Sequence, residues 1–215
     1  MIRESESDAQ DFHLYWKHPD FGAAGWNGSS WKVDNVSMTS SPAIDPLSGF
    51  AFARLEGKPF VVTEWNGGQP SDFGAENLPM IAAWGAWQNW AAIYLFDYHS
   101  NGSYARDRIE GFFSIDSHPV KMATAISSAL MFRRGDALPC PQPVTLSLPL
   151  SAAWEETAST GGQPTAAPFI KTWTQAGGGR DATLSSSARV RFEDGTTPSV
   201  SQRWKNAAGS FWARG

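Results

Sequence analysis

Three segments of the chain share one pattern, in which apolar and β-branched residues run up to a polar end. They cover residues 12–16, 58–65 and 92–98. Aromatic and β-branched side chains favour extended structure, so each segment is predicted to be a strand. The side chains near the polar ends are of types that take part in chemistry. They are His13, Tyr15, Glu64, Asp97 and His99.

Longer segments with helical spacing separate and follow these strands. Residues 46–56 stop before Gly57, a residue type that commonly ends a helix. Asn77 can cap a second helix and Ser117 can cap a third, each with a proline in its first turn. Apolar residues recur every three or four positions on both helices, which predicts one buried stripe on each. The stripes hold Met80, Trp84, Trp87 and Ala91 on the second helix and Met122, Ile126 and Leu130 on the third.

The order of these elements predicts an α/β fold. Strands that alternate with helices are typical of a parallel sheet covered by its helices, and this pattern spans residues 1–136. Residues 137–143 are rich in proline and are predicted to be a linker. Residues 144–215 are rich in Ser, Thr, Gly and Ala and predict a small, incomplete β-rich region. Its expected strands are residues 144–150, 169–174 and 188–192.

Charge and composition argue against several classes of partner. The net charge is -4 and the basic residues are scattered, which is not the pattern of a nucleic-acid binding surface. The apolar runs 81–85 and 91–96 are too short to cross a membrane, and residues 1–10 lack the apolar core of a signal peptide. We therefore expect neither a nucleic-acid nor a membrane partner.

Cysteine and histidine positions argue against metal and redox chemistry. Cys140 is the single cysteine, so neither an intrachain disulfide nor a multi-cysteine metal site is expected. The four histidines lack the spacing of a zinc motif. No metal and no cofactor is predicted. The histidines are His13, His18, His99 and His118.

Glu64 is the residue best placed for chemistry. It closes an apolar strand and is followed by Trp65, Asn66 and two glycines, which indicate a close approach of the backbone. Ligands of parallel α/β sheets bind beyond the carboxyl ends of the strands. A retaining glycosidase needs one carboxylate there as nucleophile and a second acid about 5–5.5 Å away. The alternative is that Glu64 ends a loop or pairs with an arginine.

Four segments, in order, resemble the last three barrel units of clan A glycoside hydrolases, and most closely the family 5 cellulase-like enzymes. The stretch Lys-Pro-Phe-Val-Val-Thr-Glu ending at Glu64 is the most specific, and the resemblance covers roughly residues 10–138. It implies the carboxy-terminal part of a (β/α)8 barrel followed by the start of a β-rich module. It also implies a secreted bacterial protein. The segments are residues 12–19, 57–66, 88–98 and 132–136.

The resemblance implies a carbohydrate substrate, no cofactor, and a role for each residue at the strand ends. Glu64 takes the place of the nucleophile, and His13 and Tyr15 take the place of residues that orient it or the substrate. The remaining positions would border and close the sugar subsite. They are Trp65, Asn66, Asp97, Tyr98 and His99.

The chain departs from the family pattern in two ways. No Asn-Glu dipeptide, the family's mark of the acid/base residue, occurs in the sequence, and the first five strands have no counterpart. General acid help alone contributes about 10²–10⁴-fold to such rates. The open edges of half a barrel favour pairing with a second copy, so a homo-oligomer is predicted. The candidates for the missing acid are Glu76, Asp97, Glu110 and Glu64 of a second copy.

Three functions are compatible with these features. The first is hydrolysis of O-glycosidic bonds by a retaining mechanism. The second is a catalytically impaired remnant that binds carbohydrate through its aromatic residues. The third is an esterase, which is disfavoured because no Gly-x-Ser-x-Gly motif is present.

Overall fold

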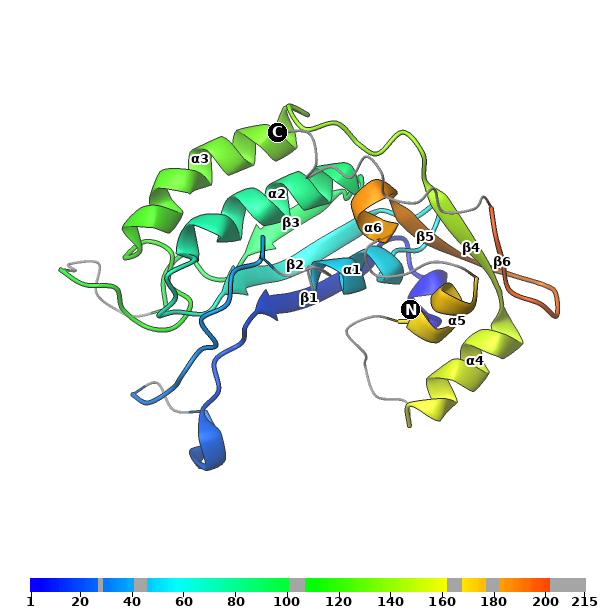
Figure 1. Cartoon of the computed structure of the whole chain (residues 1–215), viewed down its shortest axis with the longest axis horizontal. Helices are drawn as coiled ribbons and strands as arrows, with labels where there is room; N and C mark the ends of the chain where they lie inside the picture. The colour runs from blue at the N-terminus through cyan, green and yellow to red at the C-terminus, as the bar shows by residue number, and fades with distance from the viewer. Residues whose placement is uncertain (27–28, 41–45, 101–106, 162–167, 177–181, 202–215) are drawn as a thin grey trace.

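The computed structural model describes residues 1–26, 29–40, 46–100, 107–161, 168–176 and 182–201 (Figure 1). The protein is mixed α/β, as predicted, with two separate sheets. The described residues do not close a barrel. No helix among them is long and apolar enough to cross a membrane.

The first sheet contains the three predicted strands. They are β1 (Gln10–Trp16), β2 (Phe60–Gly67) and β3 (Ala92–Leu95), in the order β1-β2-β3, and each neighbouring pair is parallel. Parallel neighbours need a crossover, and helices provide it. The crossover helices are α1 (Leu47–Ala53) between β1 and β2, and α2 (Asn77–Trp87) between β2 and β3. The third predicted helix, α3 (Pro119–Arg133), follows β3 and lies beside α2 (Figure 1).

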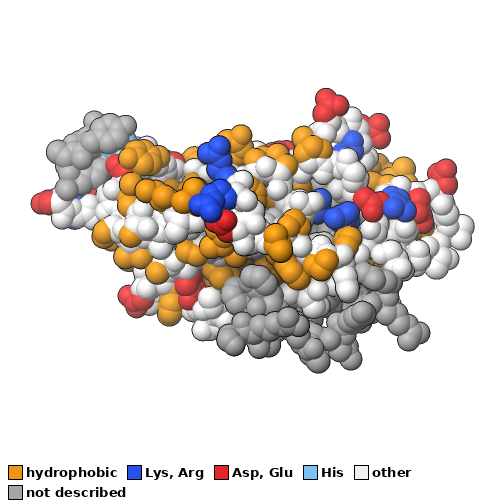
Figure 2. Space-filling view, turned by 90° about the horizontal axis from the view of Figure 1, so that it is seen from above, with side chains coloured by type: hydrophobic (Ala, Val, Ile, Leu, Met, Phe, Trp, Pro, Cys, Tyr) orange, Lys and Arg blue, Asp and Glu red, His pale blue; other side chains and the backbone are white. Residues whose placement is uncertain are grey.

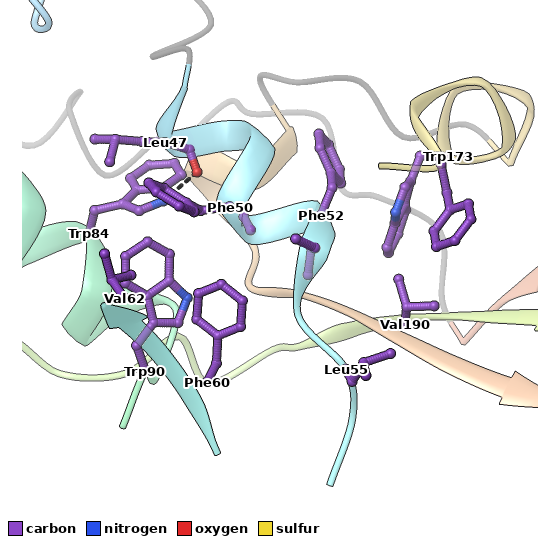
Figure 3. Packing of buried hydrophobic residues seen from close by; sticks show 14 of the residues in the cluster. Leu47, Phe50, Phe52, Leu55, Phe60, Val62, Trp84, Trp90, Trp173 and Val190 are labelled. Atoms are coloured by element: carbon purple, nitrogen blue, oxygen red, sulfur yellow. Dashed lines mark hydrogen bonds between the residues drawn. The ribbon is translucent and has the colours of Figure 1, made fainter. Parts of the chain in front are cut away.

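Aromatic side chains hold α1 and α2 against one face of this sheet (Figure 3). Phe50 of α1 lies edge-on to Phe12 and Trp90, with ring centroids 5.6 Å apart in both pairs. Trp84 of α2 donates its indole N–H to the carbonyl of Leu47 at 3.0 Å. Burial of each such side chain contributes roughly 1.5–3 kcal/mol to folding. The aromatic richness of the sequence is thus used largely in the core.

The other face of the sheet is open. Asp11 and His13 are exposed, and Thr63 and Glu64 are half-buried, in contrast to the fully buried Val62. Asp11, His13 and Tyr15 alternate along β1 and share one face. Thr63 and Glu64 hydrogen-bond to Asp11 and Tyr15, so they lie on the same face, although the pairing of β2 is irregular there.

The stripe predicted for α2 is buried in part, and the stripe predicted for α3 is not buried. Met80 and Trp84 belong to the core. Met122, Ile126 and Leu130 of α3 are exposed, Ile126 by 74%. The prediction of an inward apolar stripe was therefore wrong, because α3 turns its Lys121 and Ser128 face inward instead. Figure 2 looks onto this side of the molecule and shows hydrophobic side chains at its surface.

The second sheet is built by the carboxy-terminal part. It contains β4 (Val144–Pro149), β5 (Ala188–Glu193) and β6 (Ser199–Val200) in the order β5-β4-β6. Strand β4 is parallel to β5 and antiparallel to β6. Two of the three strands predicted here are thus confirmed. Three helices follow β4 in the chain and precede β5. They are α4 (Leu150–Ser159), α5 (Ile170–Gln175) and α6 (Ala182–Ser185).

The strand predicted at residues 169–174 was wrong, because this segment forms α5. Thr172 and Trp173 are its buried residues, and Phe169, immediately before the helix, is buried as well. Packing of these side chains against the core overrides the local preference for a strand. Trp173 is fully buried and its ring lies 5.2 Å from Phe52. The region is therefore mixed α/β rather than β-rich.

The core continues from the first sheet into the second. Leu55, after α1, forms an isolated parallel bridge with Val190 of β5, and both side chains belong to one buried cluster. Gln88 at the end of α2 donates its amide to the carbonyls of Thr183 and Ser186 at 3.2 and 3.3 Å. The proline-rich segment packs here too, since Cys140 is buried and its N–H donates to Trp87.

Candidate functional site

Glu64 and Tyr15 lie side by side near the carboxyl ends of β2 and β1. The Tyr15 hydroxyl donates a hydrogen bond to Oε2 of Glu64. The register shifts between Phe12 and His13, so that His13 is opposite Glu64 and Tyr15 is opposite Asn66. The sequence prediction that places His13 and Tyr15 on the strand next to Glu64 is therefore confirmed in position. Tyr15 contacts the carboxylate directly, whereas His13 is exposed on the open face.

The surroundings of Tyr15 make it a persistent hydrogen-bond donor. Burial, the hydrogen bond to Glu64, and the charges of Glu64 and Asp97 all raise the pKa of Tyr15 well above its usual value of 10.0. The phenol is therefore protonated throughout the neutral range. Asp97 lies two residues beyond the end of β3, which pairs with β2. Two carboxylates and one phenol thus share this end of the sheet.

Asp97 and the two residues after it have different surroundings. The carboxylate of Asp97 accepts a hydrogen bond from Ser100 at 2.8 Å, and the peptide bond before Asp97 is cis. Tyr98 is exposed. His99 is paired with Asp116 at 2.8 Å, and only 9% of each side chain is exposed. His99 is therefore held within the loop rather than presented at the open face.

Trp65 was predicted to border the sugar, and the structure places it in the core instead. Its ring is fully buried and lies 6.1 Å from Phe50. Its indole N–H donates to the carbonyl of Asn77 at 3.3 Å. A ring enclosed in this way offers no face on which a sugar can stack.

Asn66 was also predicted to border the sugar, and it is a buried structural hub. Its Nδ2 donates to the carbonyls of Phe96 at 2.5 Å and Phe113 at 2.6 Å. Its Oδ1 accepts from Nζ of Lys121 at 2.8 Å and from Nδ2 of Asn77 at 3.3 Å. The side chain has no exposed surface. It joins the end of β3, the loop before α3, and the first turns of α2 and α3.

Lys121 is a second buried polar residue, and sequence reasoning did not find it. Only 1% of it is exposed, and burial lowers the pKa of Lys121 to about 7. Besides Asn66 it bonds the carbonyl of Gly67 at 2.8 Å. Its place in the first turn of a helix gave no signal, because lysine is normally a solvated residue there.

The two glycines after Asn66 lie where the backbone passes close to other groups, as predicted. A Cβ atom on Gly67 would collide with the side-chain amide of Asn77, and one on Gly68 would lie 2.7 Å from the carbonyl of Lys17. In both cases the neighbouring group belongs to the protein and not to a ligand site. The adjacent hollow has a volume of about 10 Å³, which is room for one water molecule and not for a sugar. Lys121, His118 and Asn77 are among its lining residues.

An aromatic group adjoins Tyr15 and extends to the surface. Phe113 stacks on Tyr15 with ring centroids 4.4 Å apart, and His18 lies 5.4 Å from Tyr15. Trp26 lies 5.2 Å from His18 and is 72% exposed. Sequence reasoning missed Trp26 and Phe113, because both lie in loops where no periodicity marks them. The aromatic group also contains the rings of Phe21, Trp31, Phe96 and Phe112.

Two of the acids considered as the missing acid/base have other partners. Burial favours a higher pKa for Glu76, but hydrogen bonds from Ser37, Thr39 and the Met38 N–H outweigh it and lower the pKa. A carboxylate held in its ionised form is unsuited to donate a proton. Glu110 lies 3.4 Å from Nε of Arg108.

Comparisons of the chain with protein-family models, with curated proteins and with solved structures found no match. Among the described residues, no group of three His, Cys, Asp or Glu side chains is arranged to hold a metal ion.

Proposed function

We propose that the chain carries the nucleophile side of a retaining glycoside hydrolase site, with Glu64 as the nucleophile. The observation that supports this most directly is the hydrogen bond from Tyr15 to Glu64 at the carboxyl ends of parallel strands, with the charge of Asp97 nearby. Ligands of parallel α/β proteins bind at this end. In this proposal the three β/α units are the last three of a (β/α) barrel.

The proposed reaction uses both carboxyl groups. Glu64 attacks the anomeric carbon, the bond to the leaving oxygen breaks, and that oxygen takes a proton from Asp97. Water then attacks the glycosyl-enzyme, Asp97 takes a proton from it, and Glu64 leaves as a carboxylate. The hydroxyl of Tyr15 occupies one oxygen of Glu64, which leaves the other oxygen to react. Asp97 is assigned as the acid because it lies two residues beyond the end of β3, the strand that pairs with β2 beside Glu64.

Turnover of a panel of nitrophenyl glycosides tests the nucleophile. We expect the wild type to release nitrophenol with retention of anomeric configuration, and Glu64→Gln to fall to the rate without enzyme. Glu155→Gln is the matched control, since Glu155 is an exposed carboxylate on α4. Equal turnover by wild type and Glu64→Gln, or inversion of the product, would contradict the proposal. A preference for nitrophenyl acetate would instead favour an esterase.

The role of Asp97 is tested with two kinds of leaving group. Asp97→Asn should slow hydrolysis of an unactivated alkyl glycoside by about 10²–10⁴-fold, because the leaving oxygen needs a proton. Hydrolysis of a dinitrophenyl glycoside should be far less affected, since that leaving group departs as an anion. An equal loss on both substrates would assign Asp97 another role.

A second candidate function is carbohydrate binding without hydrolysis. The exposed Trp26 in the aromatic group favours it, because exposed aromatic rings with a polar edge are suited to contact partly apolar ligands. Retardation in a polysaccharide gel that Trp26→Ala abolishes, together with no turnover, would support binding alone. Trp154→Ala is the control, since Trp154 is exposed on α4.

We also propose that a second copy covers the open edges of the first sheet. Strands β1 and β3 each pair with β2 alone among the described residues, and unpaired strand edges favour association. Light scattering at micromolar concentration is expected to give a dimer mass. A monomer mass across the concentration range would contradict this expectation.

A further inference from the structure

Lys121 occupies a position where an ammonium group is costly. It is 1% exposed, and its Nζ bonds two neutral acceptors, Oδ1 of Asn66 and the carbonyl of Gly67, both at 2.8 Å. A buried charged group destabilises a fold unless it is well satisfied. An apolar side chain of the same length would fill the space at lower cost. The presence of a lysine here therefore indicates that its hydrogen bonds have a role beyond filling space.

The group that it holds is the amide of Asn66. Both N–H groups of that amide are used, one on the carbonyl of Phe96 and one on the carbonyl of Phe113. This arrangement fixes Oδ1 on the side of Lys121, which donates to it. The bond from Lys121 is 2.8 Å long and that from Asn77 is 3.3 Å, and protonation of the amine strengthens the first, so Lys121 fixes the amide more firmly than Asn77 does.

The two carbonyls bonded by Asn66 belong to Phe96 and Phe113, which are next to residues of the candidate site. Phe96 precedes Asp97 in the chain. The ring of Phe113 stacks on Tyr15 at 4.4 Å, and Tyr15 donates to Glu64. The end of β3 and the ring behind Tyr15 are thus held by the same side chain.

We propose that Lys121 is a positioning residue, which acts through Asn66 to keep Asp97 and Tyr15 in place around Glu64. The proposal rests on the function proposed above. Lys121 itself reaches no substrate, because the hollow beside it holds no more than one water molecule. Its effect on the site is therefore indirect.

The titration of Tyr15 reports on this arrangement without any substrate. The pKa of Tyr15 is raised by burial and by Glu64 and Asp97, so loss of their positions should bring it back toward 10. NMR with tyrosine labelled in the ring would follow it. At pH 10 we expect Tyr15 to stay protonated in the wild type and in Lys171→Met, an exposed lysine on α5, and to be largely ionised in Lys121→Met. An unchanged value in a folded Lys121→Met would overturn the proposal.

A second variant covers the case in which Lys121→Met fails to fold. Lys121→Gln keeps an N–H donor but no charge, so an intermediate pKa of Tyr15 is expected. A pKa equal to that of the wild type would overturn the proposal in this variant as well.

Kinetics separate this proposal from the proposed function. If the wild type hydrolyses aryl glycosides, Lys121→Met should lower kcat by about a hundredfold with a smaller change in KM, as for a displaced reacting group. An equal kcat would overturn the positioning role. If no protein hydrolyses them, the proposed function fails, and the Tyr15 titration still decides whether Lys121 holds the site.

Discussion

A lysine whose amine titrates near neutral pH links the stability of the fold to pH. The pKa of Lys121 is about 7 in the folded chain and 10.5 in the unfolded chain. Between these values the unfolded state holds the extra proton, so stability rises with pH and the destabilising effect is complete below pH 7. Burial and the charge of Lys121 lower the pKa of His118, so His118 titrates below this window.

We therefore expect the free energy of unfolding to rise between pH 7 and 10. The slope should be about 1.4 kcal/mol per pH unit, taken as the difference between wild type and Lys121→Met. Urea denaturation at several pH values measures it. Parallel pH profiles for the two proteins would show that the amine does not change its protonation on folding.

The hydroxyl of Tyr15 gives a second prediction at this scale. Tyr15→Phe removes one hydrogen bond to a carboxylate, worth about 1.5–3 kcal/mol, while the ring can still stack on Phe113. We expect glycosidase kcat to fall by roughly 10–100-fold and the thermal midpoint to fall by several degrees. A fall in thermal stability with no change in kcat would assign the hydroxyl to folding alone.

The sequence was sufficient to predict Glu64 and Tyr15 as neighbours, because strand-end residues of a parallel sheet meet at one edge. It was insufficient for Trp65 and Asn66. The pairing of β2 with both neighbours is irregular near Glu64, so simple alternation does not give the face of each side chain. Lys121 could not be predicted at all, since its environment comes from residues far away in the chain.

At the scale of elements, the helices show how an apolar pattern can mislead. Ile126, Met122 and Leu130 have helical spacing, yet they lie on the outer face of α3. A shallow depression of about 410 Å³ lies there, lined in part by Arg133 and Arg134. Periodicity predicts that a helix has two faces, and only the packing partner decides which face is inward.

Two substitutions with opposite expectations test this orientation of α3. Ile126→Lys should change the free energy of unfolding by less than about 0.5 kcal/mol, as for a surface position. Trp84→Ala in α2 should lower it by about 3–5 kcal/mol, because that ring is in the core. Urea denaturation of both proteins provides the comparison. A large loss in Ile126→Lys would mean that another chain covers this face.

At the scale of the whole molecule, the proline-rich segment does not separate two cores. The change in composition near residue 136 predicted a boundary, but Gln88 and Leu55 reach across to β5 and the residues before it. Contacts between residues about a hundred positions apart leave no local pattern in a sequence. The class of fold could therefore be predicted, and the continuity of the core could not.

This continuity predicts a single unfolding transition. Tryptophan fluorescence and circular dichroism in the far ultraviolet should give the same urea midpoint, because tryptophans of both parts lie in one cluster. Val190→Ala in β5 should lower that midpoint for both signals together. Two separate midpoints, with only one of them moved by Val190→Ala, would indicate independent domains.

The crowded backbone at Gly67 and Gly68 restricts which amino acids the fold tolerates at these two positions. Even a single methyl group at either place would meet Asn77 or the carbonyl of Lys17. A library randomised at both codons and selected only for a folded product should return glycine at each. The neighbourhood of Glu64 would then be preserved by steric exclusion, whether or not selection acts on any reaction.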